Sequence, residues 1–223
     1  MGDSHVAIEY VGYRANDVMA HLFGEDWQGQ GRTIEFRALD GYVSRIVVSR
    51  FAEEEAYLVF ARKDGAPFTV DNVEQNQMGV PLGPYYLVWD NISSPALVVE
   101  GTRNWPYQVK EVHLATLPDE ALVPTGLDAG FHEGAELVGT HCLSCHEVNG
   151  FGGAKFEGNL AEIVKEYGKA DFLRLVLTPA SERTGATMPA LSDRLSEGER
   201  RRVADAVFDY LKAVPVRPKS PIE

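Results

Sequence analysis

Apolar residues in the first half of the chain come in short runs, either alternating with polar residues or unbroken. Both patterns are typical of β-strands. Thr33–Phe36 alternates, which suits a half-buried strand, whereas Tyr57–Ala61 is nearly all apolar and suits a central one. Asp40-Gly41 and Asp64-Gly65 lie between such runs as turn signals. The predicted strands are Thr33–Phe36, Val43–Val48, Tyr57–Ala61, Tyr85–Trp89 and Tyr107–Leu114.

Helical spacing of apolar residues is found near the start of the chain and again after residue 130. Residues 10–23 are predicted to form a short helix that turns Val11, Val18 and Leu22 inward. Ser196 and Glu199 make a capping-box pattern that opens a last helix, and Pro215 ends it. The other predicted helices are Gly130–Cys142, Ala161–Tyr167 and Asp171–Leu177.

The change from strand to helix patterns coincides with a stretch that has the composition of a linker. Residues 117–129 contain Pro118, Pro124 and Gly126 among acidic residues. We therefore expect two domains, 1–124 and 125–223, and an extended proline-rich tail at the end of the second. The residue patterns of the first domain indicate mixed α and β structure, and those of the second domain indicate helices and glycine-rich loops.

Charge and composition narrow the choice of partner. The 223 residues carry a formal net charge of −12, of which −9 lies in residues 1–125. Nucleic acids attract Lys and Arg, so no nucleic-acid partner is expected. The sequence has no run of 18 or more apolar residues, so no transmembrane segment is expected. Its start, Met1–His5, has no pattern of a signal peptide.

The two cysteines of the chain fall in Cys142-Leu143-Ser144-Cys145-His146, a Cys-x-x-Cys-His sequence. This pattern predicts covalent attachment of one c-type haem, because each thiol can add to one vinyl group and the next histidine can bind the iron. A thioredoxin-like redox pair, a zinc site and a structural disulfide are the alternatives. Glycines follow at once where a redox pair would continue as a helix, and no further cysteine is available for zinc.

A sixth iron ligand is expected from a methionine. Besides Met1, the chain has Met19, Met78 and Met188. Met188 is followed by Pro189 in a polar loop before the last helix, so we interpret it as the axial ligand opposite His146. The alternative is a methionine that fills the core.

Residues 130–214 resemble a class I monohaem cytochrome c domain. The resemblance rests on the helix that leads into Cys142–His146, on Met188-Pro189 and on the amphipathic last helix. It implies an all-α class I cytochrome c domain, in which the first and last helices cross at Gly134 and Tyr210. With the mixed pattern of residues 1–124, the expected fold class is an α+β N-terminal domain followed by this all-α class I cytochrome c domain. The family often has a proline whose carbonyl orients the proximal histidine. Glu157–Leu160 has none, so a different carbonyl is expected for His146.

Residues 32–116 show a weaker resemblance to the molybdopterin-binding fold of sulfite oxidase-type proteins. It rests on four segments, Leu39–Tyr42, Ala56–Ala61, Pro84–Trp89 and Trp105–Val109. Such proteins hold molybdenum with a cysteine thiolate, and this region has no cysteine. No molybdopterin is therefore expected, and the domain is interpreted as a docking module. A small-molecule pocket lined by residues near Trp89 and Trp105 is the alternative.

Together these observations predict an electron-transfer protein rather than an enzyme. It would pass single electrons through one covalent haem c to or from a partner oxidoreductase, such as a dehydrogenase, a cytochrome or an oxidase. The resemblance implies a periplasmic location, with the signal peptide removed. The alternative functions are a haem enzyme and a haem-based sensor with a small-molecule pocket in the first domain.

Overall fold

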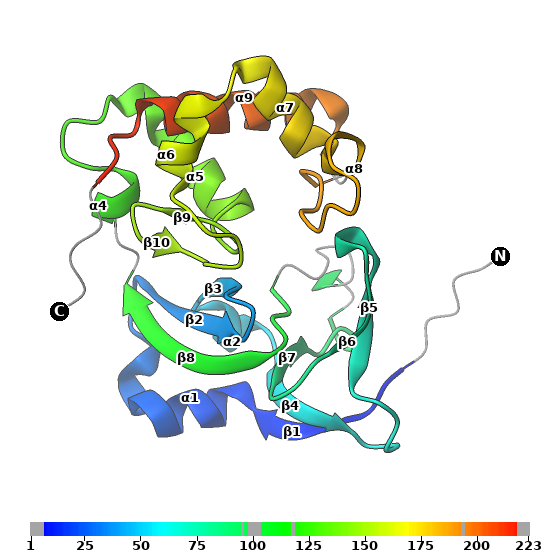
Figure 1. Ribbon diagram of the computed structural model, residues 1–223. Helices are drawn as coiled ribbons and strands as arrows, with labels where there is room; N and C mark the ends of the chain where they lie inside the picture. Colours follow the sequence, from blue (N-terminus) through cyan, green and yellow to red (C-terminus); the bar gives the residue numbers. More distant parts are fainter. Residues whose placement is uncertain (1–6, 95, 98–103, 117–118, 193–194, 218–223) are drawn as a thin grey trace. The chain divides into compact units, whose positions relative to one another are not determined.

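The computed structural model describes residues 7–94, 96–97, 104–116, 119–192 and 195–217, which form mixed α/β structure with small sheets (Figure 1). The chain divides into two compact units. The first unit comprises Met1–Leu39, Ser44–Val70 and Gly79–Leu117. The second comprises Asp40–Val43, Asp71–Met78 and Pro118–Glu223.

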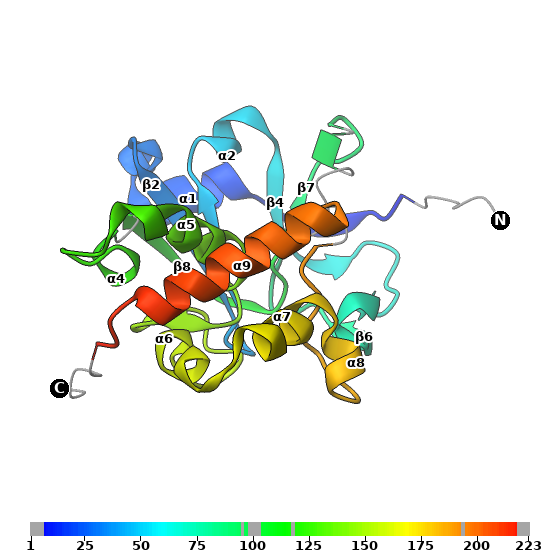
Figure 2. The ribbon, with the colours of Figure 1, turned by 90° about the horizontal axis from the view of Figure 1, so that it is seen from above.

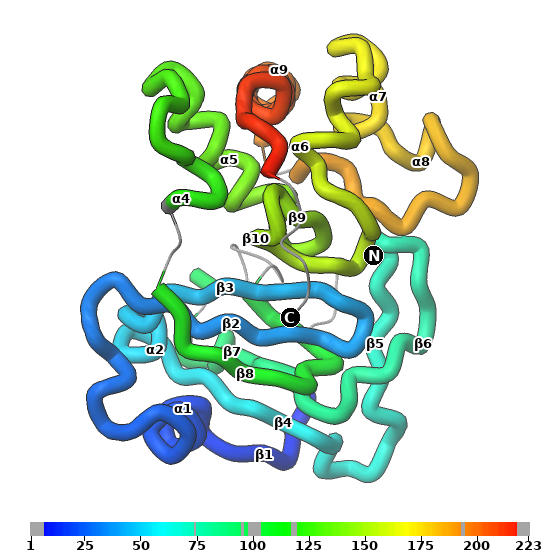
Figure 3. Tube along the Cα trace, turned by 60° about the vertical axis from the view of Figure 1, so that its left-hand side comes forward, coloured from blue at the N-terminus to red at the C-terminus, as the bar shows by residue number. Residues whose placement is uncertain are grey.

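The sheets are made of ten strands within the described residues. Two three-stranded sheets have the orders β1-β4-β7 and β3-β2-β8, and β2 and β8 lie side by side in Figure 3. Two further pairs are β5-β6 and β9-β10. The bounds are β1 Tyr10–Arg14, β2 Arg32–Ala38, β3 Val43–Val47, β4 Ala56–Arg62, β5 Thr69–Asn72, β6 Gln77–Pro81, β7 Tyr86–Trp89, β8 Val109–Thr116, β9 Glu147–Val148 and β10 Phe151–Gly152. All five predicted strands are confirmed as β2, β3, β4, β7 and β8.

The helices are mostly short. The α-helices are α1 Ala15–Phe23, α2 Arg50–Glu53, α4 Asp119–Leu122, α5 His132–His141, α6 Leu160–Ile163, α7 Lys169–Leu177, α8 Pro179–Glu182 and α9 Glu197–Ala213. The 3₁₀ turns are η1 Glu25–Gln28, η2 Val73–Gln75, η3 Ala129–Phe131 and η4 Val164–Glu166. None of the helices in the described ranges is long and apolar enough to cross a membrane.

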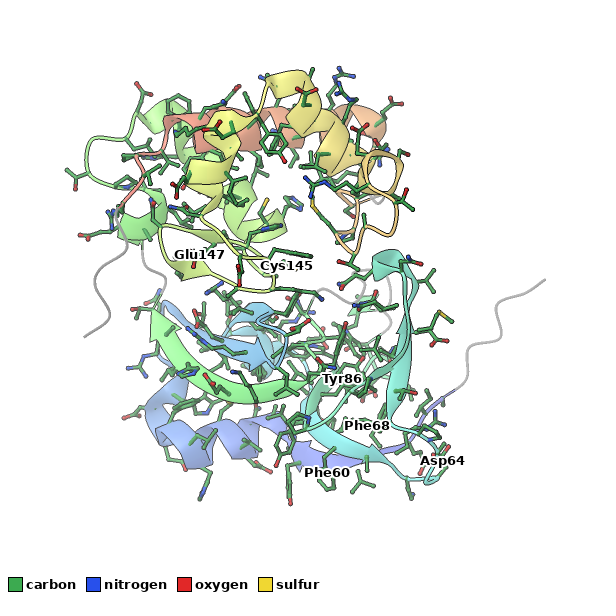
Figure 4. The ribbon with its side chains drawn as sticks, in the orientation of Figure 1. Phe60, Asp64, Phe68, Tyr86, Cys145 and Glu147 are labelled. Atoms are coloured by element: carbon green, nitrogen blue, oxygen red, sulfur yellow. The ribbon has the colours of Figure 1, made fainter. Side chains whose placement is uncertain are left out.

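The core of the first unit is aromatic. Phe51 lies at its centre, with ring centroids of Trp27, Phe36 and Trp89 at 5.7, 6.2 and 5.1 Å. Edge and tilted ring contacts of this kind add to the burial of large apolar surfaces. Phe60 is partly exposed on β4 and is labelled in Figure 4.

The predicted helix at 10–23 is wrong in its first five residues, which form β1. Gly12 pairs with β4 so closely that a Cβ there would lie 2.4 Å from the carbonyl oxygen of Leu58. The helix begins at Ala15 and buries Ala15 and Met19, whereas Val11 and Leu22 are exposed. The error arose because the strand partner is distant in sequence, and helical spacing in a short segment does not reveal it.

The second unit is organised around α9, which packs on α5 and α7 (Figure 2). The capping box is confirmed: the Ser196 side chain accepts a hydrogen bond from the Glu199 N–H, and the Glu199 carboxylate accepts one from the Ser196 N–H. The predicted crossing of the first and last helices is also confirmed. A Cβ on Gly134 would lie 2.5 Å from the Cβ of Tyr210, so only glycine lets the helices approach this closely.

The predicted fold class, with a separate all-α class I cytochrome c domain, is wrong. The second unit contains the β9-β10 hairpin and takes in Asp40–Val43 and Asp71–Met78 from the N-terminal half of the sequence. The hairpin forms because Asn149 and Gly150 both adopt positive φ, which suits a two-residue turn. Helical periodicity reports only local structure, so it could not reveal these inserted segments.

The residues of the predicted linker from Pro118 onward belong to the second unit. The predicted boundary between 124 and 125 places Asp40–Val43 and Asp71–Met78 in the first domain, whereas they cluster with the second unit. Leu122, Val123 and Leu127 pack against the second unit's core, so these linker residues are part of that unit. The extended tail was predicted for the end of the chain, and its last part, residues 218–223, lies outside the described residues.

Candidate haem-attachment site

The Cys-x-x-Cys-His sequence forms a turn that continues directly from α5. The Cys142 N–H donates to the Val138 carbonyl over 2.9 Å, which completes the helix. The His146 N–H then donates to the Cys142 carbonyl over 3.0 Å, and the Cys145 N–H does so over 3.2 Å. Leu143 is buried in the core and anchors the turn. Both thiols and the imidazole therefore belong to a single turn of backbone.

The glycine-rich segment after this turn folds back onto it. The Gly153 N–H donates to the Leu143 carbonyl over 2.9 Å and to the His146 carbonyl over 3.0 Å. A Cβ on Gly152 would lie 2.1 Å from the His146 carbonyl oxygen, and one on Gly153 would lie 2.2 Å from that of Ser144. These two glycines are therefore required for the close approach of backbone to backbone. Figure 4 labels Cys145 and Glu147 in this region.

The two thiols are free and are not joined in a disulfide. Burial, and to a smaller extent the neighbouring Cys145, raises the pKa of Cys142 to about 12. Burial likewise raises the pKa of Cys145 to about 11. A thioredoxin-like pair depends on a lowered thiol pKa, so this environment does not favour that alternative. Two protonated thiols beside an imidazole have the donor chemistry that thioether attachment of a haem requires.

His146 is held by stacking. Its ring lies parallel to that of Phe156 within 25°, with centroids 5.2 Å apart. Burial lowers the pKa of His146, which favours the neutral imidazole that binds metals. The contact described for the His146 ring is its stacking on Phe156, and the carbonyl expected to orient the ring stays a prediction.

The structure separates the three candidate methionines. Met19 is fully buried in the core of the first unit, and Met78 is 72% exposed on β6. Met188 is half-buried in the loop between α8 and α9, in the same unit as His146. The Leu191 N–H ties this loop to the Val176 carbonyl over 2.9 Å. Figure 1 shows the loop in orange, below α7 and α9. Cys142, Cys145 and His146 thus share one turn, while Met188 comes from a separate loop.

A second set of residues around the turn was not predicted from the sequence. The Ser144 carbonyl accepts from the Val43 N–H over 2.8 Å, and the Gly41 carbonyl accepts from the Ala154 N–H over 2.8 Å. Lys155 pairs with Asp40 at 2.9 Å. Asp40-Gly41 was interpreted as a turn signal and as part of the Leu39–Tyr42 segment, and nothing local in the sequence connects it to residues 144–155.

The two tryptophans near which the alternative small-molecule pocket was expected pack in the core of the first unit, Trp105 as a partly buried residue. Trp89 is buried in the core, and its Nε1–H donates to the Asn104 carbonyl over 2.7 Å. The Asp90 carboxylate accepts from the N–H groups of Ile92 and Ser93 and so closes a turn. These residues serve packing and turn formation.

Clusters of three or more His, Cys, Asp or Glu side chains that could hold a metal ion are not found among the described residues. A scan against protein-family models and a search of the curated proteins find no match to this sequence.

Proposed function

We propose that this protein carries single electrons through one haem c attached at Cys142 and Cys145, with His146 and Met188 as the axial iron ligands. The observation that carries the proposal is the single turn on which two free thiols precede a half-buried imidazole. Two thiols on one turn, followed by a histidine, are the residues that would hold a single haem c. The glycine-rich segment after the turn, through the hydrogen bonds of the Gly153 N–H to the Leu143 and His146 carbonyls, fixes the shape of the turn.

Attachment would use the chain's own S–H groups. Cys142 and Cys145 would hold the haem through thioether bonds, each S–H adding across one vinyl double bond with sulfur on one carbon and hydrogen on the other. The bound haem supplies the ferrous–ferric couple. His146 would offer a neutral imidazole, and a Met188 thioether would raise the reduction potential and keep small molecules from the iron.

The proposed partner is a periplasmic redox protein, namely a dehydrogenase, a cytochrome or an oxidase. A covalent haem of this type implies an exported protein. The acidic balance of the chain, −12 overall, supports a partner with a basic contact surface. Complementary charges of this kind raise the association rate at low salt.

Export of the protein together with a haem c attachment system tests the proposal. Haem should stay with the denatured polypeptide, and the alkaline pyridine spectrum should be that of two thioether bonds. Cys142→Ala should shift this spectrum toward that of a single thioether, and Cys142→Ala with Cys145→Ala should release the haem. Recovery of the wild-type chain without covalent haem would refute the proposed function.

Met188 is tested against Met78, which is exposed in the same unit. The ferric protein should show the weak absorption band near the red edge that is typical of Met–iron bonding. Met188→Ala should lose the band and gain binding of small iron ligands, whereas Met78→Ala should change neither. Survival of the band in Met188→Ala would show that the ligand assignment is wrong.

A further inference from the structure

One buried cation lies next to the attachment turn. The Lys155 side chain is 10% exposed and its Nζ lies 2.9 Å from Asp40 Oδ2. The same Nζ donates to Gln75 Oε1 over 2.8 Å. These three residues come from three separate segments of the chain, and all belong to the second unit.

Backbone contacts fix Lys155 beside Cys145. The next residue, Phe156, donates its N–H to the Cys145 carbonyl over 3.1 Å. The preceding residue, Ala154, donates to Gly41, where a Cβ would lie only 2.7 Å from the Ala154 carbonyl carbon. The segment around Lys155 is therefore held on both sides.

Lys155 and Asp40 are therefore held at the attachment turn as a pair of opposite charges, and replacing Lys155 by a neutral residue would leave Asp40 there without its partner.

We propose that Lys155 is a positioning residue whose buried positive charge, held by Asp40 and Gln75, raises the reduction potential of a haem attached at Cys145. This inference rests on the proposed function. Reduction adds one negative charge at the iron, so a fixed cation nearby favours the reduced state. Two unit charges about 10 Å apart at an effective dielectric constant of about 20 change an equilibrium by roughly tenfold.

Potentiometric titration of the holoprotein tests the inference. Lys155→Gln should lower the potential by about 60 mV, which is a tenfold change for a one-electron couple. Lys155→Arg keeps the charge and should restore the wild-type value. Asp40→Asn removes the opposing charge and should raise the potential. It also provides a second route to the answer if Lys155→Gln fails to fold.

Lys169→Gln is the matched control. Lys169 also pairs with two carboxylates, those of Asp205 and Asp209, but its side chain is 44% exposed. The control removes the same formal charge at a site that salt screens, so its effect should be small and should vanish at high salt. The shift in Lys155→Gln should persist in salt.

The possible failures can be told apart. Absence of covalent haem in the wild-type protein would overturn the proposed function and this inference with it. If haem is attached, equal potentials in wild type and Lys155→Gln would overturn the inference alone. A shift that Lys155→Arg does not restore would also overturn it, because the effect would then come from packing rather than from charge.

Discussion

The crossing of α5 and α9 gives the sharpest test of how the second unit is packed. Gly134→Ala adds a methyl group where a Cβ would lie 2.5 Å from the Tyr210 Cβ and 2.7 Å from the Ala206 carbonyl oxygen. One of these contacts is with helix backbone, so a side-chain rotation cannot relieve it. The two helices must separate to admit the methyl group.

The expected cost follows from two opposing effects. Overfilling a packed contact costs about 1–3 kcal/mol. Replacing glycine by alanine within a helix stabilises the folded protein by up to about 1 kcal/mol. The net effect should be a loss of about 1–2 kcal/mol, or a fall in the unfolding midpoint of roughly 2–8 °C.

Gly139 provides the control within the same helix. A Cβ there would lie 3.9 Å from Leu122 Cδ1, an ordinary contact. Gly139→Ala should therefore stabilise the protein by up to about 1 kcal/mol. Urea unfolding followed by far-ultraviolet circular dichroism measures both variants. Equal stability changes in the two variants would refute the close crossing at Gly134.

Three further predictions concern other parts of the fold. Ser196→Ala should cost about 1 kcal/mol by removing the cap of α9, measured by urea unfolding. Gly153→Ala should lower the thermal midpoint and the yield of attached haem, because its Cβ would meet the Ser144 carbonyl; an unchanged yield would contradict this. The Glu35 carboxylate, 7% exposed, pairs with Arg45 at 2.7 Å. Burial acts to raise the pKa of Glu35, but the contacts with Arg45 and Arg37 outweigh burial, so the pKa of Glu35 is lowered. Glu35→Gln should therefore cost about 3 kcal/mol near pH 7. Unfolding at several pH values should show this deficit shrinking as the pH falls below about 4.

The sequence predicted features whose causes are local. Alternation located β2 and β8, and the Ser196–Glu199 spacing located the start of α9. The β9-β10 hairpin could also be predicted from the sequence, because Asn149-Gly150 is a strong two-residue turn signal.

Other features depend on partners that are far apart in the chain. Lys155 and Gln75 are separated by 80 positions, and no spacing rule links them. The strand at Tyr10–Arg14 likewise forms because β4 offers it a partner. For the candidate site, the motif contains the reactive groups, whereas Phe156, on which His146 stacks, lies outside the motif and no spacing rule links the two residues.

The second unit is made of three separate segments of the chain, so no single continuous fragment of the gene encodes this unit and nothing else. A fragment that begins at Pro118 would contain the cysteine pair but would lack Asp40–Val43 and Asp71–Met78. Lys155 would lose both of its partners, and the Ser144 carbonyl would lose the N–H of Val43. The segment with the cysteine pair therefore cannot be transferred on its own to another protein. Recombination that joined it to a different leading sequence would have to bring these two short insertions along.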